Sequence, residues 1–169
     1  MLSQDKIKKL SYCALMAALA LIFSYIETLF PIPAPIPGVK IGIANLVILI
    51  IIYRFNFKIA FAVNVFRIIV SSLLFSGVFA MIYSLAGGIL SILFMYMLYK
   101  TGKFSIVGVS LIGGVMHNLG QLITASLIME TPSLMSYFSI LLFAGIISGV
   151  VIGIVAYLVE RRLPNDIRL

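Results

Sequence analysis

Long apolar runs separated by short basic clusters make up most of this chain. A helix needs about 20 apolar residues to cross the hydrocarbon core of a bilayer, and six stretches of the sequence approach that length. We therefore predict an all-α, polytopic membrane protein in which residues 1–169 form a single transmembrane domain. The predicted spans are residues 11–30, 39–53, 59–76, 80–99, 104–129 and 137–159.

Three of these boundaries depend on local sequence. The first helix ends before PIPAPIPG (31–38), because its four prolines cannot continue a regular helix. The second predicted helix is short, so it either begins inside the proline segment or stops below the membrane surface. Arg67 is the only charge between Lys58 and Lys100. That stretch is too long for one span, and we divide it at FSGVF (75–79).

Composition supports the same class of protein. The chain is 63% hydrophobic and 10% charged, whereas soluble domains carry roughly 25% charged residues. Its net charge is +7, but the basic residues lie between apolar runs, which is typical of membrane topology rather than of nucleic-acid binding. The N-terminus resembles a signal peptide, yet its apolar part is long and has no clear cleavage site, so we expect a retained helix.

Six spans place both termini on the same side of the membrane. All 12 Lys and Arg residues then face that side except Lys40 and Arg67. By the positive-inside rule this side is the cytoplasm. A five-span arrangement would put Arg161 and Arg162 outside, so six spans are favoured. We expect a multi-pass protein of the cell membrane with both termini cytoplasmic.

Polar side chains inside the predicted helices are the candidate functional residues. Ionisable groups are costly in a membrane and by default mark a functional site. In the predicted arrangement they come from four helices and gather in the outer half of the bilayer. This asymmetry predicts a ligand pocket open to the outside rather than a continuous pore. The candidates are Glu27, Lys40, Asn45, Asn64, Arg67, His117, Asn118 and Gln121.

Helical spacing and charge indicate what such a pocket would bind. Asn64 lies one turn from Arg67, and His117 shares a face with Gln121 at spacing i, i+4. Glu27 offsets only one of the two buried cations, which leaves a mildly positive site suited to an anionic or amphoteric ligand. Arg67 can hold a carboxylate or phosphate through two hydrogen bonds.

A purely structural role is the alternative for each of these groups. Arg67 and Glu27 would then form a structural ion pair, and His117 would bond a neighbouring carbonyl. For Asn118 a structural role is favoured over ligand binding.

Small residues on two predicted helices indicate close helix packing. Gly145, Gly149 and Gly153 form a ridge on the last helix, and Ala14 and Ala18 form a small face on the first. Packing inside one bundle explains both features. The alternative for the first helix is that this face docks a separate membrane subunit.

Several kinds of site are absent from the sequence. There is no G-x-x-x-x-G-K-[ST] motif for ATP hydrolysis. One histidine and the single Cys13 argue against a metal centre. Asp5 and Asp166 lie near the termini, so no aspartate-rich pair exists to hold magnesium on a diphosphate. We expect no enzymatic activity, no metal and no cofactor.

Three stretches give the chain a resemblance to a known family. They are PGVKIGIANLVILI (37–50), YSLAGGILSILFMYML (83–98) and VSLIGGVMHNLGQLI (109–123). With its K-x-G-x-A-N and H-N-x-G-Q patterns, the chain resembles the Gx transporter family over roughly residues 10–157. Members of that family are often called heptaprenyl diphosphate synthase component I, and they are grouped with the S components of energy-coupling factor (ECF) transporters.

The resemblance implies a six-helix protein that binds a small molecule from outside. S components work with a transmembrane coupling subunit and two cytoplasmic ATPases, and they meet the coupling subunit through an A-x-x-x-A face on the first helix. Ala14 and Ala18 match that pattern. The residues that match the family motifs are Lys40, Gly42, Asn45, His117, Asn118, Gly120 and Gln121.

The leading hypothesis is therefore an S-component-like, substrate-binding subunit of an ATP-driven importer. The alternative is an accessory membrane component of prenyl diphosphate synthesis or of a membrane redox system. A stand-alone transporter or channel is less favoured, because the sequence has no visible inverted repeat of the kind that many secondary transporters have.

Overall fold

The computed structural model describes residues 4–29 and 42–163, and these ranges contain helices and no strand. The helices are α1 (Gln4–Leu29), α2 (Ile43–Arg54), α3 (Phe57–Ser71), α4 (Val78–Thr101), α5 (Ile106–Ile128) and α6 (Phe138–Arg162). A π-helical turn, η1 (Ser72–Ser76), follows α3, and a 3-10 helix, η2 (Pro132–Tyr137), precedes α6. Five helices are long and apolar enough to cross a membrane. The predicted all-α polytopic fold is confirmed.

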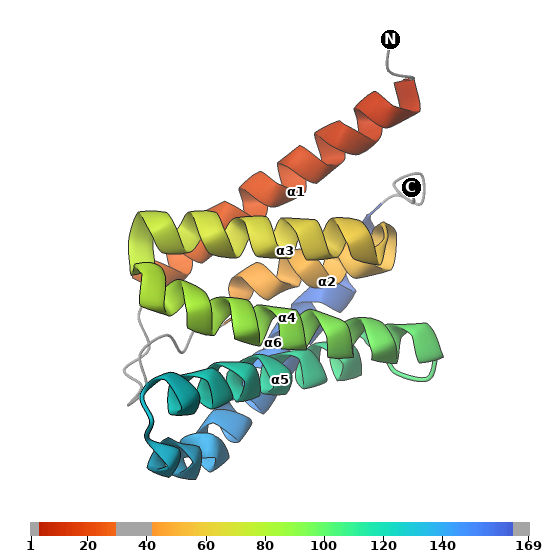
Figure 1. Cartoon of the computed structure of the whole chain (residues 1–169). Coiled ribbons are helices and arrows are strands. Elements are labelled where there is room, and N and C mark those ends of the chain that lie inside the picture. The colour runs from red at the N-terminus through yellow and green to blue at the C-terminus, as the bar shows by residue number, and fades with distance from the viewer. Residues whose placement is uncertain (1–3, 30–41, 164–169) are drawn as a thin grey trace.

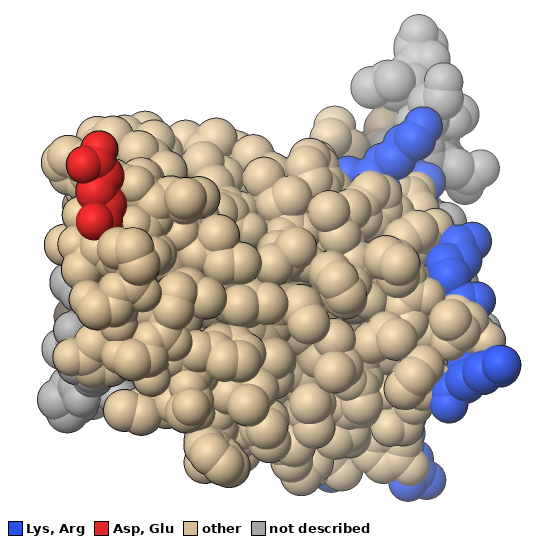
Figure 2. Space-filling view, turned by 60° about the horizontal axis from the view of Figure 1, so that its bottom comes forward, with Lys and Arg blue, Asp and Glu red and all other residues tan. Residues whose placement is uncertain are grey.

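Successive helices run in opposite directions, so the start of α1 and the end of α6 lie toward the same side of the bundle (Figure 1). The α2–α3 and α4–α5 connections lie on that side too. Lys and Arg gather there on the face drawn in Figure 2, while an acidic group lies at the opposite end. The N-terminal half of α1 projects beyond the other helices (Figure 1).

The break between α3 and α4 falls where the sequence predicts it. Helix α3 continues directly into the π-helical turn η1. Gly77 then adopts a φ of 84° before α4 begins at Val78. A positive φ is costly for residues with a Cβ. Gly77, inside the predicted segment 75–79, therefore allows the chain to reverse direction.

Helix α2 is short and central. Its 12 residues rise about 18 Å, less than the roughly 30 Å of a hydrocarbon core. Nine of the 12 are buried, and α2 packs against α1, α3, α4 and α6. Residues 39–41 of the predicted span over 39–53 lie outside the described residues, and the described part is a helix over 43–54 that begins inside the bundle. A helix that is apolar on all sides is stable only when it is buried.

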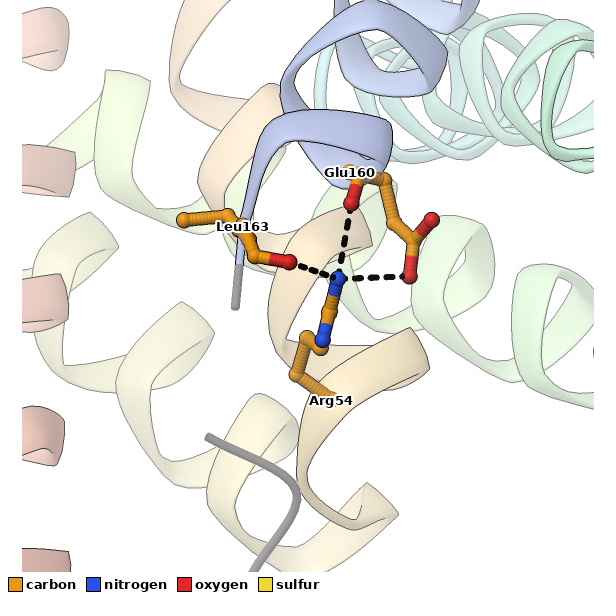
Figure 3. Close-up of polar contacts among 3 residues, drawn as sticks. All are labelled: Arg54, Glu160 and Leu163. Carbon is orange, nitrogen blue, oxygen red and sulfur yellow. Dashed lines mark hydrogen bonds and ion pairs between the residues drawn. The ribbon is translucent and has the colours of Figure 1, made fainter. Parts of the chain in front are cut away.

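Arg54 fixes the far end of α2 to the end of α6 (Figure 3). Its Nη2 donates to the carbonyl oxygens of Glu160, at 2.7 Å, and Leu163, at 3.1 Å. It also lies 3.0 Å from Oε1 of Glu160. The last carbonyls of a helix have no partner within the helix, and a cation is favourable there. One buried guanidinium thus caps α6 and anchors α2.

The glycine ridge of α6 packs inside the bundle against α5. A Cβ on Gly149 would lie 2.7 Å from Cα of Leu111, and one on Gly153 would lie 2.7 Å from Cα of Val107. Such contacts are shorter than real carbon atoms allow, so only glycine lets the two backbones approach this closely.

Candidate ligand-binding site

A buried arginine connects three helices at the centre of the bundle. Arg67, on α3, is 6% exposed. Its Nη2 donates to Oδ1 of Asn45 on α2, at 2.8 Å, and to Oδ1 of Asn64, at 2.9 Å, and its Nε also donates to Asn64. The Nδ2 of Asn64 in turn donates to the carbonyl oxygen of Gly88 on α4, at 3.0 Å. The predicted pairing of Asn64 with Arg67 on one helix face thus continues into α2 and α4.

The N-terminus of α2 opens onto the same region. The first backbone N–H groups of a helix need acceptors from outside the helix, and Gly42, before α2, provides no side-chain cap. Instead, Oε1 of Glu27 on α1 accepts a hydrogen bond from the Ile43 N–H at 2.5 Å. Glu27 is 6% exposed, and a carboxylate at a helix N-terminus is favoured by the helix dipole.

Four of the predicted site residues line one small cavity. Its volume is about 20 Å³, and a single water needs roughly 10–15 Å³. The described cavity therefore has room for about one water, so an organic ligand requires it to open. Its lining residues are Glu27, Gly42, Asn45, Arg67, Ile68, Ser71, Ser84 and His117.

A second cavity of about 20 Å³ adjoins the first and shares Gly42 and Asn45 with it. It lies between α2 and the tightly packed helices α4, α5 and α6. Because glycines line much of it, backbone rather than bulky side chains forms its walls. The other lining residues are Met95, Ser110, Gly113, Gly114, Ser148, Gly149 and Ile152.

Three of the remaining predicted residues lie away from the lining of both cavities. Asn64 accepts hydrogen bonds from Nε and Nη2 of Arg67. The Nδ2 of Asn118 donates to the carbonyl oxygen of Leu141 on α6, at 2.8 Å, and so links α5 to α6. Gln121 packs against α4, since its Cγ would lie 2.8 Å from a Cβ on Gly87. Lys40 lies outside the described residues.

The cavity also contains serines that the sequence did not single out. Ser71 lies one turn after Arg67 on α3, so helical spacing could have indicated it. Ser84 comes from α4, where nothing in the local sequence distinguishes it from other helix serines. Within the described ranges, no group of three His, Cys, Asp or Glu side chains could hold a metal ion.

The small-residue face of the first helix is exposed. Ala14 and Ala18 are open to the surroundings of the bundle, and only 17% of the apolar window of α1 is buried, the lowest share among the five long helices. Helix α1 packs mainly on α2 and α3. Its outer face is therefore available to lipid or to another membrane protein.

Five long apolar helices around a short buried one, with a polar cluster at the start of that helix, define a polytopic membrane protein with an internal polar site. Residues 16–159 match the model of the family described as heptaprenyl diphosphate synthase component I, and the chain belongs to that family. No curated protein and no solved structure matches the chain significantly. The family resemblance is thus confirmed, and the relation to S components stays a prediction.

Proposed function

We propose that this protein is the substrate-binding subunit of an ECF-type, ATP-driven importer and that its ligand binds at the Arg67 cluster. The main observation is that α2 begins inside the bundle, where Glu27, Asn45, Arg67 and His117 line one cavity. Interrupted helices at membrane depth are tolerated only where they are buried or line a cavity. In transporters such helix ends often mark substrate sites.

Charge and position support an anionic or amphoteric ligand that enters from outside. Six of the eight cavity residues come from the end of α1, the start of α2 and the second half of α3, away from the basic end of the bundle. If the basic end is cytoplasmic, as the positive-inside rule requires, the cavity lies toward the exterior. Arg67 and the positive end of the α2 dipole both favour a negative group.

The proposed partners are a transmembrane coupling subunit and cytoplasmic ATPases. The exposed small face at Ala14 and Ala18 offers a surface for the coupling subunit. Small residues allow close contact between membrane helices. The chain needs such partners to drive import, since it has no ATP-binding motif of the P-loop type.

Native mass spectrometry of the detergent-purified full-length protein tests this proposal. We expect wild type to retain a small molecule, and Arg67→Ala and His117→Ala to retain less while staying folded. Arg161→Ala, at an exposed position on α6, is the matched control and should bind as wild type does. If both cavity variants also bind as wild type does, the site assignment is wrong.

Transport itself needs a second measurement. Proteoliposomes that contain the protein together with a coupling subunit and ATPases should accumulate the ligand only when ATP is present. Uptake without any ATPase would instead support a stand-alone transporter.

The second candidate is an accessory role in prenyl diphosphate synthesis, which the family description favours. A groove of about 440 Å³ at the basic end is lined by Tyr53, Ser105, Ile106, Val107, Tyr157 and Glu160. Ligand pockets commonly measure about 300–1,000 Å³, so this groove could hold part of a prenyl chain. Co-purification with a soluble synthase, and none with ATPase subunits, would favour this function.

A further inference from the structure

We infer that the position of the Glu27 carboxylate is the acid-group subsite of this cavity, and that a carboxylate or phosphate of the ligand replaces Glu27 there. The inference rests on the proposed function in one respect, because it takes the Arg67 cluster as the ligand site. Beyond the proposed function, the inference states where in the cavity the acid group of the ligand binds and that it displaces the Glu27 carboxylate.

The capping of α2 is the first observation. Helices usually begin with a local cap such as Ser, Thr, Asp or Asn, whose side chain accepts from the first turn. Gly42 stands at that position, with a φ of 86° and no side chain. The acceptor is Glu27, 16 positions earlier and on another helix. A helix N-terminus binds phosphates and carboxylates readily, so an acid group that is not part of the chain can take the same place.

Arg67 is the second observation. It lines the same cavity as Glu27 and interacts with that carboxylate electrostatically, while its hydrogen bonds go to the amide oxygens of Asn45 and Asn64. Burial in a low-dielectric region strengthens the attraction between this guanidinium and any anion in the cavity. An incoming acid group would therefore meet both the α2 N-terminus and a buried cation.

Ser84 is the third observation and independently indicates a ligand. It is 6% exposed and lines the cavity, and among the described residues its hydroxyl has no hydrogen-bond partner. Because Ser84 lines the cavity, a ligand oxygen there would supply a hydrogen-bond partner for its hydroxyl.

Cavity size indicates displacement rather than addition. About 20 Å³ is available beside the Glu27 carboxylate, which suits one water and is too little for a second carboxylate or a phosphate. An acid group can reach the Ile43 N–H only if Glu27 moves away. Ligand binding would then release a hydrogen bond that joins α1 to α2.

The test uses Glu27→Ala in the full-length protein in detergent, with acetate as the probe. The substitution removes a –CH₂–COO⁻ group, which acetate matches in its heavy atoms. Thermal unfolding is measured with sodium acetate, with acetamide as the neutral analogue, and with sodium chloride at equal ionic strength. We expect acetate to raise the Tm of Glu27→Ala in a saturable way, by about 2–4 °C, and acetamide to have no such effect.

Wild type and Glu27→Gln are the controls, since in both of them acetate must first displace a tethered side chain and should therefore raise the Tm much less than in Glu27→Ala. An equal effect of acetate and acetamide on Glu27→Ala, or the same acetate shift in wild type, would overturn the inference. If Glu27→Ala is lost during purification, the purification is repeated in acetate and in acetamide. Recovery in acetate alone supports the subsite, and loss in both contradicts it.

The two proposals can fail separately. A protein that retains no ligand and supports no import, but whose Glu27→Ala variant responds to acetate, would refute the importer and leave the subsite standing. If ligand retention depends on Arg67 but Glu27→Ala does not respond to acetate, the subsite is refuted and the importer proposal still stands.

Discussion

The guanidinium of Arg67 donates to the side-chain oxygen of Asn45 at 2.8 Å, which joins the second half of α3 to the first turn of α2. Asn45 therefore has a structural role in this apolar helix, because its side chain accepts a hydrogen bond from a buried guanidinium and holds it in position. Hydrogen bonds to charged groups contribute about 1.5–3 kcal/mol each. Their loss in a buried site also leaves the charge poorly solvated.

Asn45→Ala should consequently lower the free energy of unfolding by about 1.5–3 kcal/mol. Denaturation of the full chain in detergent micelles measures this. Asn56→Ala is the control, because Asn56 caps α3 at an exposed position by accepting from the Ile59 N–H. Loss of such a cap costs about 1 kcal/mol. An Asn45→Ala penalty no larger than that of Asn56→Ala would show that the Arg67 network is not formed.

Arg54→Ala should be more harmful, because it removes the cap of α6 and the anchor of α2 together. Arg54 is 3% exposed, whereas the side chain of Glu160 is 24% exposed, so part of the ion-pair energy is screened by solvent. We expect a loss of about 3 kcal/mol, mainly from the two unpaired carbonyls and the unpaired carboxylate.

The matched control for Arg54→Ala is Arg161→Ala. Arg161 is exposed and contacts Tyr157 on its own helix. This change should alter stability by less than about 0.5 kcal/mol. Similar losses for the two variants would argue against the contact drawn in Figure 3.

Gly149→Ala tests the close approach of α5 and α6. The added Cβ would meet Cα of Leu111 at 2.7 Å and the carbonyl oxygen of Ser110 at 2.8 Å. Backbone atoms cannot move aside as a flexible side chain can, so the helices must separate. Overpacking of this kind costs about 1–3 kcal/mol, which a lower thermal midpoint should report.

Gly108→Ala provides the matched glycine control on α5. Its nearest neighbours would lie at 3.6 Å or more from the new Cβ, which is ordinary van der Waals contact. Since alanine favours helix more than glycine does, this variant should be unchanged or more stable by up to about 1 kcal/mol. Equal destabilisation of both variants would contradict the packing described for Gly149.

The proposed orientation can be tested with single cysteines in a Cys13→Ala background. Lys103 and Glu130 are exposed and follow α4 and α5 respectively, so they lie at opposite ends of the bundle. A membrane-impermeant maleimide added to intact cells should label Glu130→Cys, but should label Lys103→Cys only after permeabilisation. The opposite pattern would place the basic end outside and remove the case for an external ligand.

The sequence by itself determined the class of protein, the number of helices and the break near Gly77. These features depend on local properties, namely the length of an apolar run, the position of charges and the presence of a residue that tolerates positive φ. The family assignment is also carried by the sequence, since it spans residues 16–159. The sequence also indicated that the polar side chains of four helices lie at a similar depth in the membrane, because depth follows from the position of each residue along its helix.

Only the tertiary structure decided which polar groups share a cavity. Asn45 and Asn118 are both amides in apolar helices, yet one bonds Arg67 and the other bonds the Leu141 carbonyl. Periodicity states which residues share a face of one helix, but the rotation of that helix toward its neighbours depends on packing with all of them. For the same reason the short buried form of α2, its cap by Glu27 and the small volume beside Arg67 emerge only when the helices are assembled.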